Sequence, residues 1–167
     1  LKKSGEIDSV RLQIILRATG SDDLYRPMIS DLDIADIVRL EPVVAYRTAL
    51  QEMLRADGLM LFQGSVCNHQ IPAKIYEYYR TGKPILALVD FEGVSAKMLR
   101  EANVDDLANI ADIDSIVNAI REFVKKLTEG HRLGVARSFA NDHSRKSRTQ
   151  QLGRLLDDIV GTARQSK

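Results

Sequence analysis

The sequence predicts an α/β fold, in which a doubly wound parallel sheet carries helices on both faces. Short apolar runs recur through the first half of the chain. They are nearly continuous rather than alternating, which is typical of strands covered on both faces. Amphipathic stretches with helical periodicity separate these runs. Strands separated in this way by helices form βαβ units with right-handed crossovers, which predicts a parallel sheet.

Most boundaries of the expected elements follow from helix start and stop signals. Pro72 suits the first helical position of the third helix, and Gly82 suits its C-terminal end. Asp112 and Asp114 place negative charge at the head of the fifth helix, where the helix dipole favours it. The expected strands are Leu12–Leu16, Ile37–Leu40, Leu59–Phe62 and Ile85–Val89. The expected helices cover about residues 22–31, 46–56, 72–81, 93–103 and 112–128.

Charge divides the chain of 167 residues into two parts. Residues 131–167 hold eight Lys and Arg against three Asp and Glu, whereas residues 1–130 hold sixteen against twenty. We therefore expect a Rossmann-like domain over residues 1–130. The basic tail over 131–167 would form a short helix at 134–140 and a longer one at 144–161, with its apolar residues at helical spacing. This tail is expected to pack on the domain or on a missing N-terminal domain.

The composition excludes several classes of protein. A hydrophobic fraction of 44% and a charged fraction of 28% are ordinary for a folded protein, and a net charge of +1 gives no reason to expect nucleic acid as a partner. No apolar run reaches the length of about 18 residues that a membrane span needs, and we see no signal peptide. Cys67 is the only cysteine, which rules out an internal disulfide and favours a reducing compartment. The three histidines, at 69, 131 and 143, are too dispersed for a metal motif, and we read the last two as surface residues.

The stretch after the third expected strand is the best candidate for a functional site, because ligands of doubly wound sheets bind beyond the carboxyl ends of the strands. Here a polar loop leads into a helix whose first N–H groups, at Ala73 and Lys74, form a potential anion site. Glu77 shares the face of this helix start and can accept two vicinal hydroxyls, such as those of a ribose. The alternative is an exposed Glu77 paired with Lys74 or Arg80.

At these residues the sequence resembles a known family. The run Pro72–Tyr78, followed by Gly82–Leu86, is similar to the donor-binding half of GT-B-type glycosyltransferases, in particular the retaining, nucleotide-sugar-dependent group 1 enzymes. The resemblance covers about residues 10–128 and implies a C-terminal, donor-binding domain of that fold. The supporting segments are Tyr46–Leu50 and Ala56–Leu61 before the motif, and Gly93, Ala96 and Asp112–Phe123 after it.

The resemblance implies roles for individual residues. Glu77 matches the glutamate that holds the ribose hydroxyls of the donor. The turn formed by Ile71, Pro72, Ala73 and Lys74 matches the one whose amides bind the diphosphate. The segment from Leu40 to Val43 matches the place where the base lies against backbone, and Ser65 lies in the loop that lines the pocket.

The chain departs from the family pattern in two places. The family commonly has a further glutamate eight residues before the ribose-binding one, near the transferred sugar. Here His69 occupies that position with Gln70 beside it, and either can form hydrogen bonds with sugar hydroxyls. The family's Arg and Lys pair, which neutralises the diphosphate, has no match. The chain begins after that loop, in an expected helix at Leu1–Gly5, and lacks the acceptor-binding domain.

The resemblance further implies an enzyme that transfers a sugar from a nucleoside diphosphate sugar to a saccharide or lipid-linked acceptor in polysaccharide biosynthesis. No metal or other cofactor is expected. The acceptor would bind through the missing N-terminal domain, so this part alone should bind nucleotide weakly and be nearly inactive. The expected location is the cytoplasm or, peripherally, the inner face of the membrane.

Other functions remain open at this point. A non-catalytic nucleotide-binding or assembly module of the same fold would explain the histidine at position 69. Half of a sugar-nucleotide epimerase would need further carboxylates, which we do not identify. A phosphoacceptor receiver domain is disfavoured because no Asp ends the third strand, at Phe62 to Gly64. A nicotinamide dinucleotide fold is disfavoured because the loop after the first strand has a single glycine, Gly20.

Overall fold

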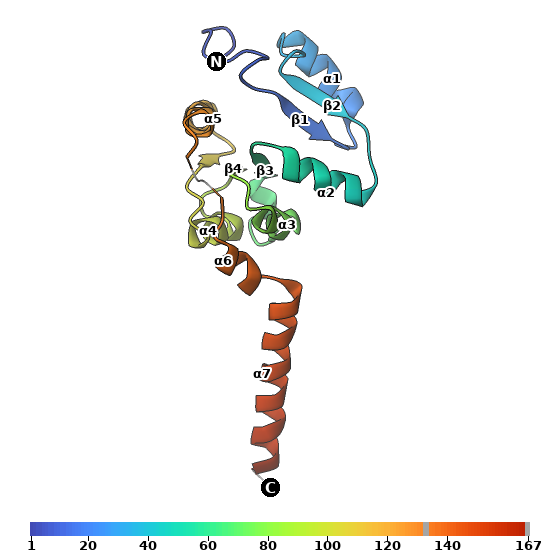
Figure 1. The fold of residues 1–167 in the computed structure, drawn as a ribbon, viewed down its shortest axis with the longest axis vertical. Helices are drawn as coiled ribbons and strands as arrows, with labels where there is room; N and C mark the ends of the chain where they lie inside the picture. Colours follow the sequence, from blue (N-terminus) through green and yellow to red (C-terminus); the bar gives the residue numbers. More distant parts are fainter. Residues whose placement is uncertain (132–133, 166–167) are drawn as a thin grey trace.

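The computed structural model describes residues 1–131 and 134–165 and confirms the α/β fold, with parallel strands, flanking helices and a C-terminal helix (Figure 1). Four strands lie close to their predicted positions: β1 (Ile14–Arg17), β2 (Val38–Glu41), β3 (Leu59–Gln63) and β4 (Ile85–Val89). A fifth strand, β5 (Leu107–Asn109), was not predicted from the sequence, because three residues are too short a run to stand out.

The strands form two parallel sheets rather than one. In the first, β1 pairs with β2, with Ile14 opposite Val38. In the second, β4 lies between β3 and β5, with Leu59 opposite Ile85 and Ala87 opposite Leu107. The edge of β1 and the edge of β3 that face away from these partners have no strand beside them among the described residues.

The helices largely match the prediction. Their bounds are α1 (Asp22–Asp31), α2 (Tyr46–Arg55), α3 (Lys74–Thr81), α4 (Val94–Glu101), α5 (Ile113–Thr128), α6 (Arg137–Asp142) and α7 (Arg145–Gln165), and a 3₁₀ turn covers Ser65–Cys67. Gly82 ends α3 in the left-handed conformation, with φ of 66°, where glycine has no steric penalty. Asp112 caps α5, because its carboxylate accepts hydrogen bonds from the N–H groups of Asp114 and Ser115 at 3.0 and 3.2 Å.

Two local predictions were wrong. Residues Leu1–Gly5 form turns instead of a helix, and the Ser4 hydroxyl donates to the Leu1 carbonyl. A segment of five residues is too short to sustain helix without packing against it. The second error concerns Pro72, which precedes α3 by two residues instead of opening it.

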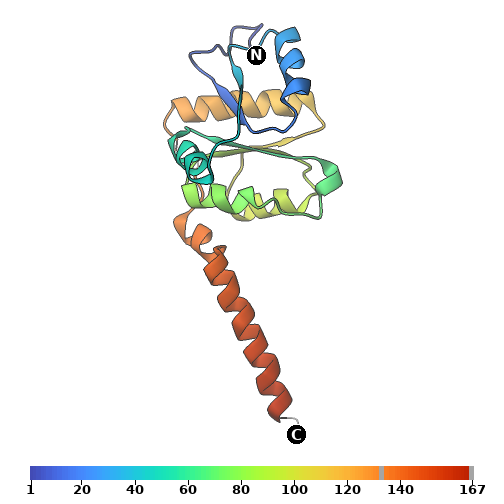
Figure 2. The same cartoon turned by 90° about the vertical axis from the view of Figure 1, so that its right-hand side faces the viewer.

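The β3–β4–β5 sheet lies between two helical layers (Figure 2), and this part holds the core. All five residues of β4 are buried. Alternate β4 residues contact opposite layers: Ala87 packs with Ile75 of α3 and Leu99 of α4, while Leu88 packs with Phe123 of α5. The prediction that strands are covered on both faces is therefore confirmed for β4.

The same prediction fails for the β1–β2 sheet. Ile15 is 55% exposed, and none of the residues of β1 or β2 is buried. Among the described helices, α1 packs against β2, and none of its own residues is buried. The strand β1 is therefore not buried on both faces, although a continuous apolar run is typical of strands that are.

The C-terminal tail begins on the domain and then leaves it. In α6, Phe139 meets Tyr79 of α3 edge to face at 5.5 Å between ring centroids, and His143 stacks on Phe139 at 4.1 Å. His143 is therefore partly buried, and the expectation of a surface residue was wrong for it. The next helix, α7, extends away from the body of the molecule (Figures 1 and 2). Within the described part of the chain, no helix has the length and hydropathy needed to cross a bilayer.

Candidate functional site

The loop that follows β3 is fixed by the last side chain of that strand. The Gln63 side-chain amide donates to the carbonyls of Cys67 and Gln70 at 2.8 and 2.6 Å. The Ser95 hydroxyl on α4 donates to the same Gln70 carbonyl at 3.2 Å. The loop therefore turns back across the carboxyl end of β3 before it enters α3.

A second set of contacts ties this loop to the end of β4. The Asn68 side-chain amide donates to the Asp90 carboxylate at 2.8 Å, and the Val94 N–H donates to the Asn68 carbonyl at 2.9 Å. The hydrogen bond from Asn68 lowers the pKa of Asp90, with help from the Glu92 N–H. The carboxyl ends of β3 and β4 thus form one continuous rim, and Asn68 and Asp90 are residues of that rim that sequence reasoning did not single out.

The start of α3 presents free backbone donors. The N–H groups of Ile75 and Tyr76 donate to the carbonyls of Pro72 and Ala73 in a tight first turn. No side chain of the described residues caps the helix. The N–H groups of Ala73 and Lys74 have no acceptor among the described residues. Since both residues are exposed, these donors and the positive end of the helix dipole are open to an anion in solution.

Glu77 lies at the surface beside this first turn. Its Oε1 accepts a hydrogen bond from the Tyr46 hydroxyl of α2 at 3.0 Å, and its Oε2 lies 3.8 Å from Nζ of Lys74. The side chain is 27% exposed, so the carboxylate is neither buried in the core nor freely mobile. The carboxylate raises the pKa of the Tyr46 hydroxyl through the hydrogen bond between them. Tyr46 was missed as a site residue because 31 positions separate it from Glu77 in the chain.

The predicted base-binding segment lies at the end of the other sheet. Leu40 is a partly buried residue of β2, and Val43, just beyond that strand, is 79% exposed. Val43 lines a shallow hollow of about 630 Å³ together with Ala18 and with Asp22 at the start of α1. The hollow therefore lies at the carboxyl ends of β1 and β2, the edge where a doubly wound sheet binds its ligands.

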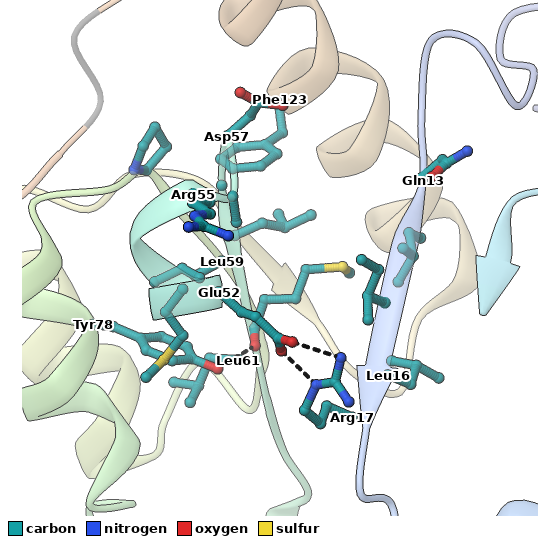
Figure 3. Close-up of a pocket in the computed structure, with 18 of the residues that line it drawn as sticks. Gln13, Leu16, Arg17, Glu52, Arg55, Asp57, Leu59, Leu61, Tyr78 and Phe123 are labelled. Atoms are coloured by element: carbon teal, nitrogen blue, oxygen red, sulfur yellow. Dashed lines mark hydrogen bonds and ion pairs between the residues drawn. The ribbon is translucent and has the colours of Figure 1, made fainter. Parts of the chain in front are cut away.

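A larger cavity, of about 1400 Å³, lies between the two sheets. Pro72, Lys74 and Val43 line it, and so does Tyr46, the hydrogen-bond partner of Glu77. An ion pair of Arg17 with Glu52 links β1 to α2 across it (Figure 3). The other predicted site residues do not line this cavity. They are Ile71, Ala73, Ser65, His69, Gln70, Glu77 and Leu40.

The structure therefore brings together only part of the predicted site. Glu77, Lys74 and the free amide of Ala73 lie on one helical turn. His69 and Gln70 are exposed on the loop before α3, with Ser65 on the 3₁₀ turn. Across residues 1–131 and 134–165 no cluster of His, Cys, Asp and Glu side chains has the arrangement of a metal site. Comparisons with protein-family models, curated proteins and solved structures find no match to this chain.

Proposed function

We propose that this chain binds a nucleoside diphosphate sugar and serves as the donor-binding domain of a glycosyltransferase. The observation that carries the proposal is the arrangement at the start of α3. There, a carboxylate oriented by Tyr46 lies one turn from two backbone N–H groups that have no acceptor in the described part of the chain. The turn offers donors for a phosphate and the carboxylate offers acceptors for sugar hydroxyls. A nucleotide sugar presents both groups next to each other.

The same turn favours the leaving diphosphate as the reaction proceeds. Negative charge grows on the diphosphate when the bond to the sugar breaks, and donors aimed at that charge stabilise the transition state more than the ground state. The amides of Ala73 and Lys74 are fixed by the helix and need no reorganisation. The Lys74 ammonium, on a side chain that is 65% exposed, adds positive charge at the same point. The acceptor and the groups that activate it would come from another domain.

Calorimetric titration with UDP-, GDP- and ADP-sugars tests the proposal. We expect one of these donors to bind, and Glu77→Ala to weaken binding by about 1–3 kcal/mol, because charge-assisted hydrogen bonds are lost. Glu122→Ala is the matched control, since Glu122 is an exposed glutamate on α5, on the opposite face of the sheet. If no donor binds, or if both variants bind as tightly as the parent chain, the proposal is wrong.

The helix α7 favours a second candidate, a non-catalytic assembly module of the same fold. Its apolar side chains lie at helical spacing and are more than half exposed, and a contiguous exposed apolar stripe is typical of a surface that binds a partner. They are Leu152, Leu155, Leu156, Ile159 and Val160. Light scattering distinguishes the candidates: an assembly module without nucleotide binding would form a defined oligomer that Leu155→Glu disrupts.

A further inference from the structure

Two strand edges face the large cavity, and neither has a partner strand within residues 1–131 and 134–165. The N–H groups of Ile14 and Ala18 donate toward β2, to the carbonyls of Ile37 and Glu41, both at 2.8 Å. Likewise, the N–H group of Leu59 donates toward β4, to the Pro84 carbonyl, at 2.8 Å. Because backbone groups of a strand point alternately to its two sides, the N–H and C=O groups of the intervening residues point away from these partners.

Four residues have backbone groups that point away from the paired strand: Ile15 and Arg17 in β1, and Met60 and Phe62 in β3. None of their N–H groups has an acceptor in the strand pairings of the described residues. The Met60 carbonyl confirms the direction, since it accepts a hydrogen bond from the Tyr78 hydroxyl at 3.2 Å instead of from a strand. Open edges of this kind are templates for pairing with another strand.

Mostly apolar side chains line the two faces of the cavity between the edges, and its charged lining residues include the ion pair of Arg17 with Glu52. Ile120 and Phe123 of α5 line it on one side, and Met53 of α2 and Tyr78 of α3 line it from other elements of the fold. Figure 3 shows β1 with Arg17 on one side of the cavity and β3 with Leu61 on the other. At about 1400 Å³ it exceeds the range of about 300–1000 Å³ that is usual for small-molecule pockets.

The order of the strands indicates which strand would fill the space between β1 and β3. In one common order of doubly wound sheets, the strand that is first in the chain lies at the centre. The second and third strands follow on one side of it, and the fourth, fifth and sixth on the other. The observed arrangement, β2 and β1 on one side and β3, β4 and β5 on the other, fits this order with the central strand left out.

We infer that a further β-strand, carried on the same polypeptide before Leu1, inserts between β1 and β3 in parallel and joins the two sheets into one. It would continue the established pairings β1–β2 and β3–β4. Its carbonyls would accept from the N–H groups of Ile15, Arg17, Met60 and Phe62, and its N–H groups would donate to the free carbonyls of the same edges. Since the walls on both faces are mostly apolar, it would be a continuous run rich in Val and Ile, as in other central parallel strands. This inference does not depend on nucleotide binding.

The position of the inferred strand in the polypeptide follows from the topology of the fold. The connection from β2 to β3 contains α2 and no strand, and after β5 the described residues form only helices, turns and a single bridge. The residues before β1 form turns and irregular chain, with no helix for a parallel crossover into β1, so that crossover would begin further upstream. A second copy of the chain is a poorer source of this strand. The inserted strand must pair on both sides, and each strand of a second copy is already paired on at least one side.

Amide hydrogen exchange on two extended chains tests the inference. In the first, a Val/Ile strand of about six residues and a Gly/Ser linker of about 20 residues, reaching about 25 Å, precede Leu1. In the second, the matched control, Ser and Gly replace the Val and Ile residues. We expect the Val/Ile prefix to slow exchange at Ile15, Arg17, Met60 and Phe62 at least about tenfold in a monomer. The amides of Ile14 and Leu59, already bonded to β2 and β4, serve as internal references.

Three results would overturn the inference. The first is protection of the four amides in the unextended monomer, since that would mean that the two sheets pair directly. The second is equally fast exchange of the four amides with both prefixes while the reference amides stay protected, since the space between β1 and β3 would then accept no strand. Protection that rises with protein concentration and accompanies a dimer would identify a second copy as the occupant instead.

Discussion

At the scale of single residues, the candidate site depends on how Glu77 is held. A glutamate on an exposed helical turn has many rotamers, and ordering it for a ligand costs conformational entropy. The hydrogen bond from the Tyr46 hydroxyl selects an orientation before any ligand arrives. Pre-ordering of this kind improves affinity without adding a contact to the ligand.

Tyr46→Phe should therefore weaken donor binding about two- to tenfold, since one hydrogen bond that orients the carboxylate is lost. Thermal stability should change little, because Tyr46 is a mostly exposed residue. Calorimetry and a melting curve on the same sample check both statements. Tyr25→Phe, at another exposed tyrosine, is the control. Equal affinities for Tyr46→Phe and the parent chain would mean that the contact does not serve binding.

A second prediction at this scale concerns the N-terminal segment and pH. The Arg121 guanidinium of α5, together with the Ser4 hydroxyl, lowers the pKa of Glu6 from 4.5 to about 2. Because the pKa is lower in the folded chain, the ion pair stabilises the fold above about pH 4.5, and this contribution is lost as the pH falls toward 2. An NMR titration of the Glu6 carboxyl should give a midpoint near 2, and Arg121→Gln should return it toward 4.5.

At the scale of secondary structure, agreement with the sequence follows the strength of the local pattern. The bounds of β4 match the prediction in full, because five consecutive apolar residues between Pro84 and Asp90 leave no other choice. The start of α3 lies two residues after the predicted one. A proline indicates that a helix starts nearby, but it does not fix the residue at which the helix starts. Tyr46 near Glu77 was not predictable, because local patterns do not report contacts between distant helices.

Burial separates α4 from α7, and a matched pair of substitutions measures the difference. Leu99 of α4 is 0% exposed, whereas Leu152 of α7 is 55% exposed. Leu99→Ala should lower the free energy of unfolding by about 2–5 kcal/mol, since it leaves a cavity in the core. Leu152→Ala should change it by less than about 0.5 kcal/mol. Urea unfolding of the two variants decides the point, and equal losses would show that α7 belongs to the cooperative core.

At the scale of the whole molecule, the sequence predicted the fold class but not the division into two sheets. Apolar runs identify buried strands, and they do not state which strands are neighbours. The run at β1 predicted burial on both faces, whereas Ile15 is exposed beside an open edge. This mismatch between pattern and burial agrees with a strand missing beside β1, and it becomes visible only when burial in the structure is compared with the sequence.

The tail divides at the boundary between α6 and α7. Tyr79, Phe139 and His143 join α6 to α3, while α7 extends beyond this contact. A chain that ends at Ser144 should therefore keep its melting temperature within a few degrees, since it retains the aromatic contacts and the core. Differential scanning calorimetry checks this expectation. A large loss of stability would show that α7 folds back on the domain in solution.

The most direct test of the account is a titration of the ¹⁵N-labelled chain with UDP-, GDP- and ADP-sugars, followed by amide chemical shifts. If the start of α3 holds the diphosphate, the amides of Ala73 and Lys74 will show the largest changes, because they donate to it. These changes will be much smaller in Glu77→Ala at the same donor concentration. Changes centred on other elements, or none at saturating donor, would contradict the proposed site.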